Sequence, residues 1–177
     1  MGRDEPTIRG ATPDDAGEVA RLLHDFNTEF DTPSPGVDVL AARLRELLAG
    51  DDTFAILAGT SAGTSAGTSA GTSAGTSPGT PAVAVALVTL RSNVWYSGPV
   101  ALLDELYVVP GRRGQGIGSA VIDHLVSLAP ARGVALIEIN VDEGDVDAQR
   151  FYVRHGFSAT EPGSTERAFY YSRELVT

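Results

Sequence analysis

One segment, from Leu103 to Leu125, most constrains how this chain can fold, because it predicts a strand, a tight turn and a helix in succession. Residues 103–109 are mostly aliphatic or β-branched and stop at Pro110, which predicts a β-strand. Apolar residues at positions 117, 121, 122, 125 and 128 follow at helical spacing and predict an amphipathic helix. The N-terminus of a helix has unpaired N–H groups and a partial positive charge. The turn is therefore predicted to bind a phosphate or pyrophosphate group.

The turn between these two elements, residues 112–118, reads RRGQGIG. Its three glycines lack the Cβ atoms that would hold a phosphate away from the backbone N–H groups. Its two arginines add positive charge to a chain whose formal net charge is −10. The glycine spacing does not match the Rossmann pattern, and a Walker A loop needs a lysine, which this chain lacks. An ADP or dinucleotide site would need an acidic ribose contact after the next strand, where Asn140 lies with Asp142 close by; that alternative stays open.

A second informative block covers residues 134–157. Residues 134–140 (VALIEIN) predict a buried strand, and an acidic loop then leads to residues 147–157, DAQRFYVRHGF. Gly156 is expected to end the helix of that segment, and Phe157 is expected to start the next strand. The ADP or dinucleotide alternative does not account for this second block.

The two blocks together resemble motifs A and B of the GCN5-related N-acetyltransferase (GNAT) superfamily. The first match is Arg113-x-x-Gly116-x-Gly118 after LYVVP, and the second is Phe-Tyr-x-x-x-Gly-Phe ending at Phe157. The resemblance implies an α/β (α+β) GNAT fold, in which about four helices flank a mixed, mostly antiparallel, splayed sheet of six to seven strands. It also implies an acetyl-CoA-dependent N-acetyltransferase, with acetyl-CoA as the cosubstrate.

The resemblance further implies which residues bind the cofactor. The turn is expected to hold the pyrophosphate, while backbone groups of the preceding strand pair with the pantetheine amides. Many relatives have an Asn where this chain has Asp145, whose carboxylate accepts but cannot donate a hydrogen bond. The implied cofactor-binding residues are Tyr107, Val108, Val109, Arg112, Arg113, Gly114, Gln115, Gly116, Ile117, Gly118, Ser119, Asn140, Asp145 and Ala148.

Acetyl transfer needs a base that deprotonates the amine and an acid that protonates the departing thiolate. Because the chain has no cysteine, an acyl-cysteine intermediate is excluded and direct transfer in a ternary complex is expected. The resemblance implies that Tyr152 is the acid; a core aromatic residue is the alternative. Asp104 and Glu105 are the candidate bases. As neighbours on a strand they are expected to face opposite sides, with the preferred Asp104 on the face of Val108.

The acceptor is predicted from charge and aromatic residues. Acidic residues cluster around the first two predicted helices and before residue 148, and an acidic surface attracts cations and repels nucleic acid. A small primary amine, such as a polyamine or an aminoglycoside-like molecule, fits this pattern. A peptide amine, a merely solubilising face and a non-catalytic acyl-CoA-binding module remain as alternatives. The predicted acceptor-binding residues are Phe26, Glu29, Phe30, Trp95 and Tyr96.

The whole chain, residues 1–177, is predicted to form a single acetyltransferase domain. Residues 58–81 contain five Ala-Gly-Thr-Ser repeats and predict a disordered loop between two strands, with an adhesive or glycosylated tract as the alternative. No metal site, leader or membrane span is expected, so the predicted location is cytoplasmic, and a homodimer stays open. Further strands are predicted at 7–11, 53–58, 82–90 and 166–172, and further helices at about 13–30 and at 37–48.

Overall fold

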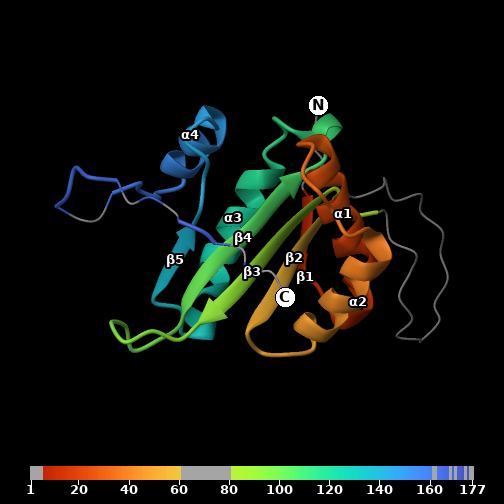
Figure 1. The fold of residues 1–177 in the computed structure, drawn as a ribbon, viewed down its shortest axis with the longest axis horizontal. Helices are drawn as coiled ribbons and strands as arrows, with labels where there is room; N and C mark the ends of the chain where they lie inside the picture. Colours follow the sequence, from red (N-terminus) through yellow and green to blue (C-terminus); the bar gives the residue numbers. More distant parts are fainter. Residues whose placement is uncertain are drawn as a thin grey trace, which may run out of the picture. The chain divides into compact units, whose positions relative to one another are not determined.

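The computed structural model describes residues 6–60, 81–160, 163–167, 169, 171–173 and 175. The chain forms two compact units, Met1–Glu138 and Ile139–Thr177. The predicted single domain stays a prediction. The strands form one sheet in the order β1-β2-β3-β4-β5 (Figure 1). They are β1 (Pro6–Gly10), β2 (Thr53–Thr60), β3 (Ala84–Arg91), β4 (Val100–Val108) and β5 (Leu136–Ile139).

The helices follow the periodicity of the sequence. The first predicted helix begins with a 3₁₀ turn, Pro13–Asp15, and the second and third begin at the predicted residues. Two further 3₁₀ turns, Pro110–Arg112 and Pro130–Arg132, flank the third helix. In α2, Leu44 is buried, whereas Val39 and Leu47 are about half-exposed. The helices are α1 (Ala16–Glu29), α2 (Val37–Leu48), α3 (Ile117–Leu128) and α4 (Val146–Arg154).

The sheet is mixed, as predicted. Strands β1 to β4 pair antiparallel with their neighbours. The chain then crosses through α3 and returns in β5 beside β4, and the arrows of these two strands run in the same direction in Figure 1. The GNAT-like α/β fold is confirmed, although the described residues contain five strands instead of six or seven.

The core of the first unit lies on both faces of the sheet. On one face, α1 and α2 pack against alternate strand residues such as Leu57, Val85 and Tyr107. On the other face, the buried side of α3 covers the intervening residues such as Ile56 and Val88. Each fully buried aliphatic side chain stabilises the fold by about 1.5–3 kcal/mol. The two layers hold β4 and the start of α3, where the candidate site lies.

Several predicted segments differ from the structure. The strand predicted as buried at residues 134–140 spans only Leu136–Ile139 and is partly buried, and Phe157 starts no strand. Strand β2 continues to Thr60 and pairs with β1, so the first repeat belongs partly to the sheet; residues 61–80, with the other repeats, lie outside the described residues. The predicted strand 166–172 is wrong for its described residues, in which Arg167 makes only an isolated bridge with Thr160. No helix of the described part of the chain is long and apolar enough to cross a membrane.

Candidate active site

The cradle turn, residues 112–118, connects β4 to α3 and contains two glycines in the left-handed region. Gly114 has φ of 72° and Gly116 has φ of 85°, values that L side chains rarely adopt. Gly116 is the N-cap of α3 and has no side chain with which to cap it. A Cβ at either glycine would meet nothing within 4 Å, so both glycines border open space. The first N–H groups of α3 are therefore in place to receive an anion from outside the helix.

The two arginines of the cradle turn have different surroundings. The guanidinium group of Arg113 makes a bidentate ion pair with Glu29 at the end of α1, with N–O distances of 2.6 and 2.7 Å. The side chain of Arg112 is exposed and makes no ion pair with any residue that the structure describes. Arg112 therefore carries an unbalanced positive charge at the surface, whereas the carboxylate of Glu29 balances the charge of Arg113. Sequence reasoning missed this pair because its partners lie 84 residues apart.

Several predicted cofactor-binding residues contribute backbone groups rather than side chains. The side chains of Tyr107 and Ile117 are buried in the core. The N–H group of Val109 already donates to the carbonyl oxygen of Val83 (2.9 Å), and Gln115 folds back to donate to Gly111. The prediction of free backbone groups is therefore wrong for the amide of Val109. Gly118 and Ser119 lie in the first turn of α3, where their backbone N–H groups belong to the anion-binding end of the helix.

The candidate bases Asp104 and Glu105 lie at a β-bulge, which the sequence did not predict. Leu87 pairs with Glu105 and Val88 pairs with Leu103, so Asp104 is the extra residue in β4. A bulge shifts the alternation of side chains by one residue. As a result, Glu105 shares the α1–α2 face with Leu87, and Asp104 accepts a hydrogen bond from Thr89 (2.6 Å) on that same face. The prediction that the two carboxylates face opposite sides is wrong.

The two carboxylates differ in their electrostatic environment. Burial, and to a smaller extent the negative charge of Asp104, raise the pKa of Glu105 above its ordinary value. Asp104 is instead exposed, and its carboxylate accepts a hydrogen bond from the hydroxyl group of Thr89. A raised pKa makes the carboxylate of Glu105 a stronger base than an ordinary glutamate.

The predicted acceptor-binding residues fall into two groups that the structure does not bring together. Phe26 and Phe30 make an edge-to-face contact at the end of α1, where Glu29 pairs with the cradle turn. Trp95 and Tyr96 lie before β4, at the other end of that strand from the cradle turn. The nine-residue strand β4, about 30 Å long, runs between the two groups. Trp95, 87% exposed, is the tip of the β3–β4 loop in which Asn93 accepts the N–H groups of residues 95 and 96.

In the second unit, Asp145 is the N-cap of α4. Its carboxylate accepts the backbone N–H of Ala148 at 2.9 Å. Gln149 donates to the carbonyl groups of Asp142 and Glu143, which fixes the acidic loop after Asn140. The helix ends as predicted at Gly156, which has φ of 85°. Helix α4 therefore supplies its own anion at its N-terminus, a role of Asp145 that the resemblance did not imply.

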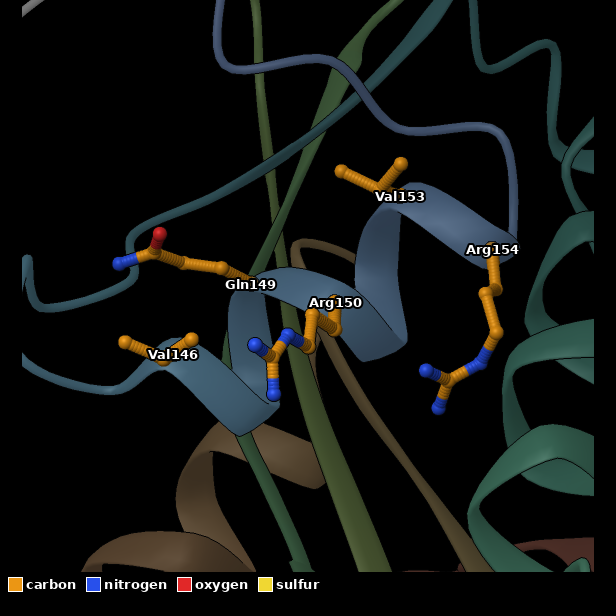
Figure 2. Close-up of a pocket in the computed structure, with 5 residues that line it drawn as sticks. All are labelled: Val146, Gln149, Arg150, Val153 and Arg154. Atoms are coloured by element: carbon orange, nitrogen blue, oxygen red, sulfur yellow. The ribbon is translucent and has the colours of Figure 1, made fainter.

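Tyr152, the predicted acid, lies on α4 and is half-buried. Its ring makes edge-to-face contacts with Phe151 and Phe157, with centroids 5.1 and 5.7 Å apart. A surface pocket of about 400 Å³ follows another side of the same helix (Figure 2). That pocket is lined by Val146, Gln149, Arg150, Val153 and Arg154, with the two arginine side chains extending to the same side in Figure 2. None of the predicted catalytic residues lines it.

Comparison with known proteins agrees with this geometry. The site defines an α/β protein in which a glycine-rich turn leaves the start of α3 accessible to an anion. The family model described as the acetyltransferase (GNAT) family matches residues 68–157. The crystal structure of an acetyltransferase from Arthrobacter sp. FB24 is 49% identical, with 99% of both chains covered and a TM-score of 0.80. The chain therefore belongs to the acetyltransferase (GNAT) family.

Two curated relatives match over shorter segments. A mycothiol acetyltransferase of Beutenbergia cavernae is 33% identical over 72 residues, which cover 39% of this chain and 24% of the relative. A peptidyl-lysine N-acetyltransferase of Salmonella typhimurium is 38% identical over 58 residues, covering 33% of this chain and 37% of the relative. The chain thus matches about a quarter of the length of the first protein and more than a third of the second.

Proposed function

We propose that this chain transfers an acetyl group from acetyl-CoA to a primary amine of a small cationic molecule, by direct attack in a ternary complex. The observation that carries the proposal is the N-terminus of α3, where left-handed Gly116 leaves the first N–H groups without a side-chain cap. The two carboxylates on β4 belong to the strand that leads directly into this turn. An anion-binding turn joined to a basic carboxylate is what transfer from a pyrophosphate-containing donor requires.

The cradle turn fits the pyrophosphate of acetyl-CoA. Gly114 and Gly116 border open space, so a phosphate group can approach the backbone without meeting a Cβ. Ile117 contributes its N–H group, since its side chain is buried beneath the helix. Arg112 adds the exposed positive charge that two phosphate groups need.

Glu105 is the proposed general base. Its raised pKa, due first to burial and then to Asp104, suits it to take a proton from the attacking amine. The amine nitrogen forms a bond to the thioester carbonyl carbon, the C–S bond breaks, and the thiolate of CoA leaves. Tyr152 is the proposed donor of the proton that this thiolate takes up, as the motif resemblance implies. Asp104, acting through a water molecule, is the alternative base.

The acceptor class rests on charge. Asp104 and Glu105 place two carboxylates on one face of the sheet, which favours a cationic amine. The names of the two curated relatives include mycothiol and peptidyl-lysine, so small-molecule and peptide acceptors both occur among similar proteins. A chain that binds CoA but acetylates no amine would instead support the alternative of a CoA-binding module.

The first test is binding, followed by turnover. Isothermal titration compares acetyl-CoA, CoA, ADP and NAD; binding of both CoA species is expected, and selective binding of ADP or NAD would contradict the proposal. Polyamines, aminoglycosides and a lysine peptide are then screened by release of the CoA thiol. The chain contains no cysteine, so it adds no background to a thiol reagent.

The pH dependence of kcat/KM identifies the base. If Glu105 is the base, E105Q abolishes the acidic limb of the profile, whereas D104N moves that limb to lower pH. The direction follows because removing the charge of Asp104 removes one of the two causes that raise the pKa of Glu105. Loss of the limb in D104N, with the limb retained in E105Q, would instead assign the base to Asp104.

A further inference from the structure

The guanidinium group of Arg113 joins three elements of the first unit. Its Nη1 and Nη2 donate to both carboxylate oxygens of Glu29, at the end of α1. Its Nε donates to the carbonyl oxygen of Val108, at the end of β4, over 2.9 Å. Because a bidentate pair fixes orientation as well as distance, Arg113 ties the cradle turn to both elements.

Tyr107 forms the base on which this pair lies. Its side chain is 4% exposed, its ring centroid is 5.6 Å from the guanidinium carbon of Arg113, and it packs against Phe26. The hydrogen bond from Arg113 lowers the pKa of Glu29, and the same bond raises the pKa of Arg113. Both groups therefore carry full charge at neutral pH and stay paired over a buried aromatic ring.

Because of this geometry, Arg112 and Arg113 differ in whether their side chains are available to a phosphate group. All three nitrogen atoms of the Arg113 guanidinium group already donate to Glu29 or to Val108. A phosphate would have to displace Glu29 to bind this group in the same way. Arg112, exposed and without an ion pair among the described residues, faces no such competition.

We infer that Glu29 is a positioning residue for cofactor binding: through Arg113 it holds the cradle turn in the conformation that receives the pyrophosphate. The inference rests on the proposed function. Arg113 directly precedes Gly114, and glycine has more backbone freedom to lose than any other residue. Fixing the turn in advance lowers the entropy cost of ordering it around the ligand, which strengthens binding without any direct contact. Glu29 thus acts on the donor side of the reaction, not on the acceptor.

A double-mutant cycle tests this inference, with CoA binding measured by titration calorimetry. E29Q and R113A are each expected to weaken CoA binding about three- to tenfold. Because the two residues act as one unit, the double variant is expected to lose no more CoA affinity than the single variant with the larger loss. In E29Q the KM for acetyl-CoA is expected to rise by a similar factor and by more than kcat falls, while the Tm stays within a few degrees of the wild type. E46Q, which removes an exposed carboxylate from α2, is the matched control and should bind CoA like the wild type.

Three results would overturn the inference. If R113A is far more damaging than E29Q and the two effects add, Arg113 binds the phosphate directly. If E29Q leaves CoA affinity unchanged but raises the KM of the amine, Glu29 binds the acceptor. If the wild-type chain binds no CoA, the proposed function fails as well. The first two results would overturn only the role of Glu29 and would leave the proposed function standing.

Discussion

Helices α3 and α4 both follow a strand and a loop, yet their N-termini have opposite chemistry. Helix α3 begins at Gly116, which has no side chain and leaves the first N–H groups to an external partner. Helix α4 begins at Asp145, whose carboxylate already accepts the N–H of Ala148. Both ends carry the same partial positive charge. The two ends differ in whether the chain itself supplies a negative charge there. Of these two helices, only α3 therefore has an N-terminus suited to bind an external anion.

A third helix start supports the same distinction. Asp15, in the 3₁₀ turn before α1, accepts hydrogen bonds from the backbone and hydroxyl of Thr12 and pairs bidentately with Arg9 at 2.7 Å. These contacts lower its pKa to about 2, chiefly through the hydrogen bond from Arg9. As at α4, a carboxylate of the chain itself lies at this N-terminal end, where it accepts the N–H of Thr12. Gly116 at the start of α3, like Gly36 at the start of α2, instead leaves the first N–H groups without a side-chain cap, at some expense of local stability.

The largest expected effect comes from closing the open N-terminus. In G116V, a β-branched side chain is forced into a left-handed conformation and projects into the space where the anion would lie. CoA affinity is expected to fall at least about 100-fold, equivalent to roughly 3 kcal/mol. Calorimetry measures the affinity, and circular dichroism checks that the helices persist. G111A, directly before the cradle turn but at an ordinary φ with open space around it, is the matched control. If G116V binds CoA as tightly as the wild type, the open N-terminus of α3 does not bind the cofactor.

The local parts of this account were predictable from sequence, whereas the long-range parts were not. The strand, the cradle turn and α3 follow from residue type and period, and Gly156 follows from helix-ending chemistry. The bulge at Asp104 arises because β4 has one residue more than β3 over the paired segment. The sequence around Asp104 alone does not reveal this difference in length. The pair of Glu29 and Arg113 likewise depends on which two elements the fold brings together. The sequence therefore predicted the strand, turn and helix of the candidate site but misjudged the directions of its two carboxylates.

A second, smaller effect, on stability, is expected at the 3₁₀ turn before α1. D15N should lower the free energy of unfolding at pH 7 by about 1–2 kcal/mol, because it removes a bidentate pair of which Arg9 is half-exposed. The folded-state pKa of about 2 lies below the unfolded value, so this stabilisation is present above about pH 4 and disappears as the pH falls toward 2. Urea unfolding at pH 7 and pH 3 measures the difference between variant and wild type. A difference that is the same at both pH values would show that the carboxylate charge is not its source.

The N-cap of α4 is expected to matter about as much as an ordinary cap. D145A should destabilise the start of that helix by about 1 kcal/mol, whereas D145N, whose side-chain oxygen still accepts the N–H of Ala148, should change it little. Hydrogen exchange of the α4 amides measures the effect. CoA affinity of D145N is expected to stay within about twofold of the wild type, since the carboxylate serves its own helix. A larger loss of affinity would show that Asp145 contacts the cofactor after all, as the motif resemblance implied.

The smallest effect is expected at Arg112, and it sharpens the comparison by separating charge from geometry. If the N–H groups of α3 provide most of the anion binding, R112A removes only a screened surface charge and should weaken CoA binding about two- to threefold. The same variant should make CoA affinity less dependent on salt concentration, because fewer exposed charges then act on the phosphates. Calorimetry at low and high salt measures both quantities, with R43A on α2 as a control that removes an equal charge elsewhere. A loss in R112A as large as that in G116V would mean that side-chain charge, and not the open end of the helix, dominates binding at the cradle turn.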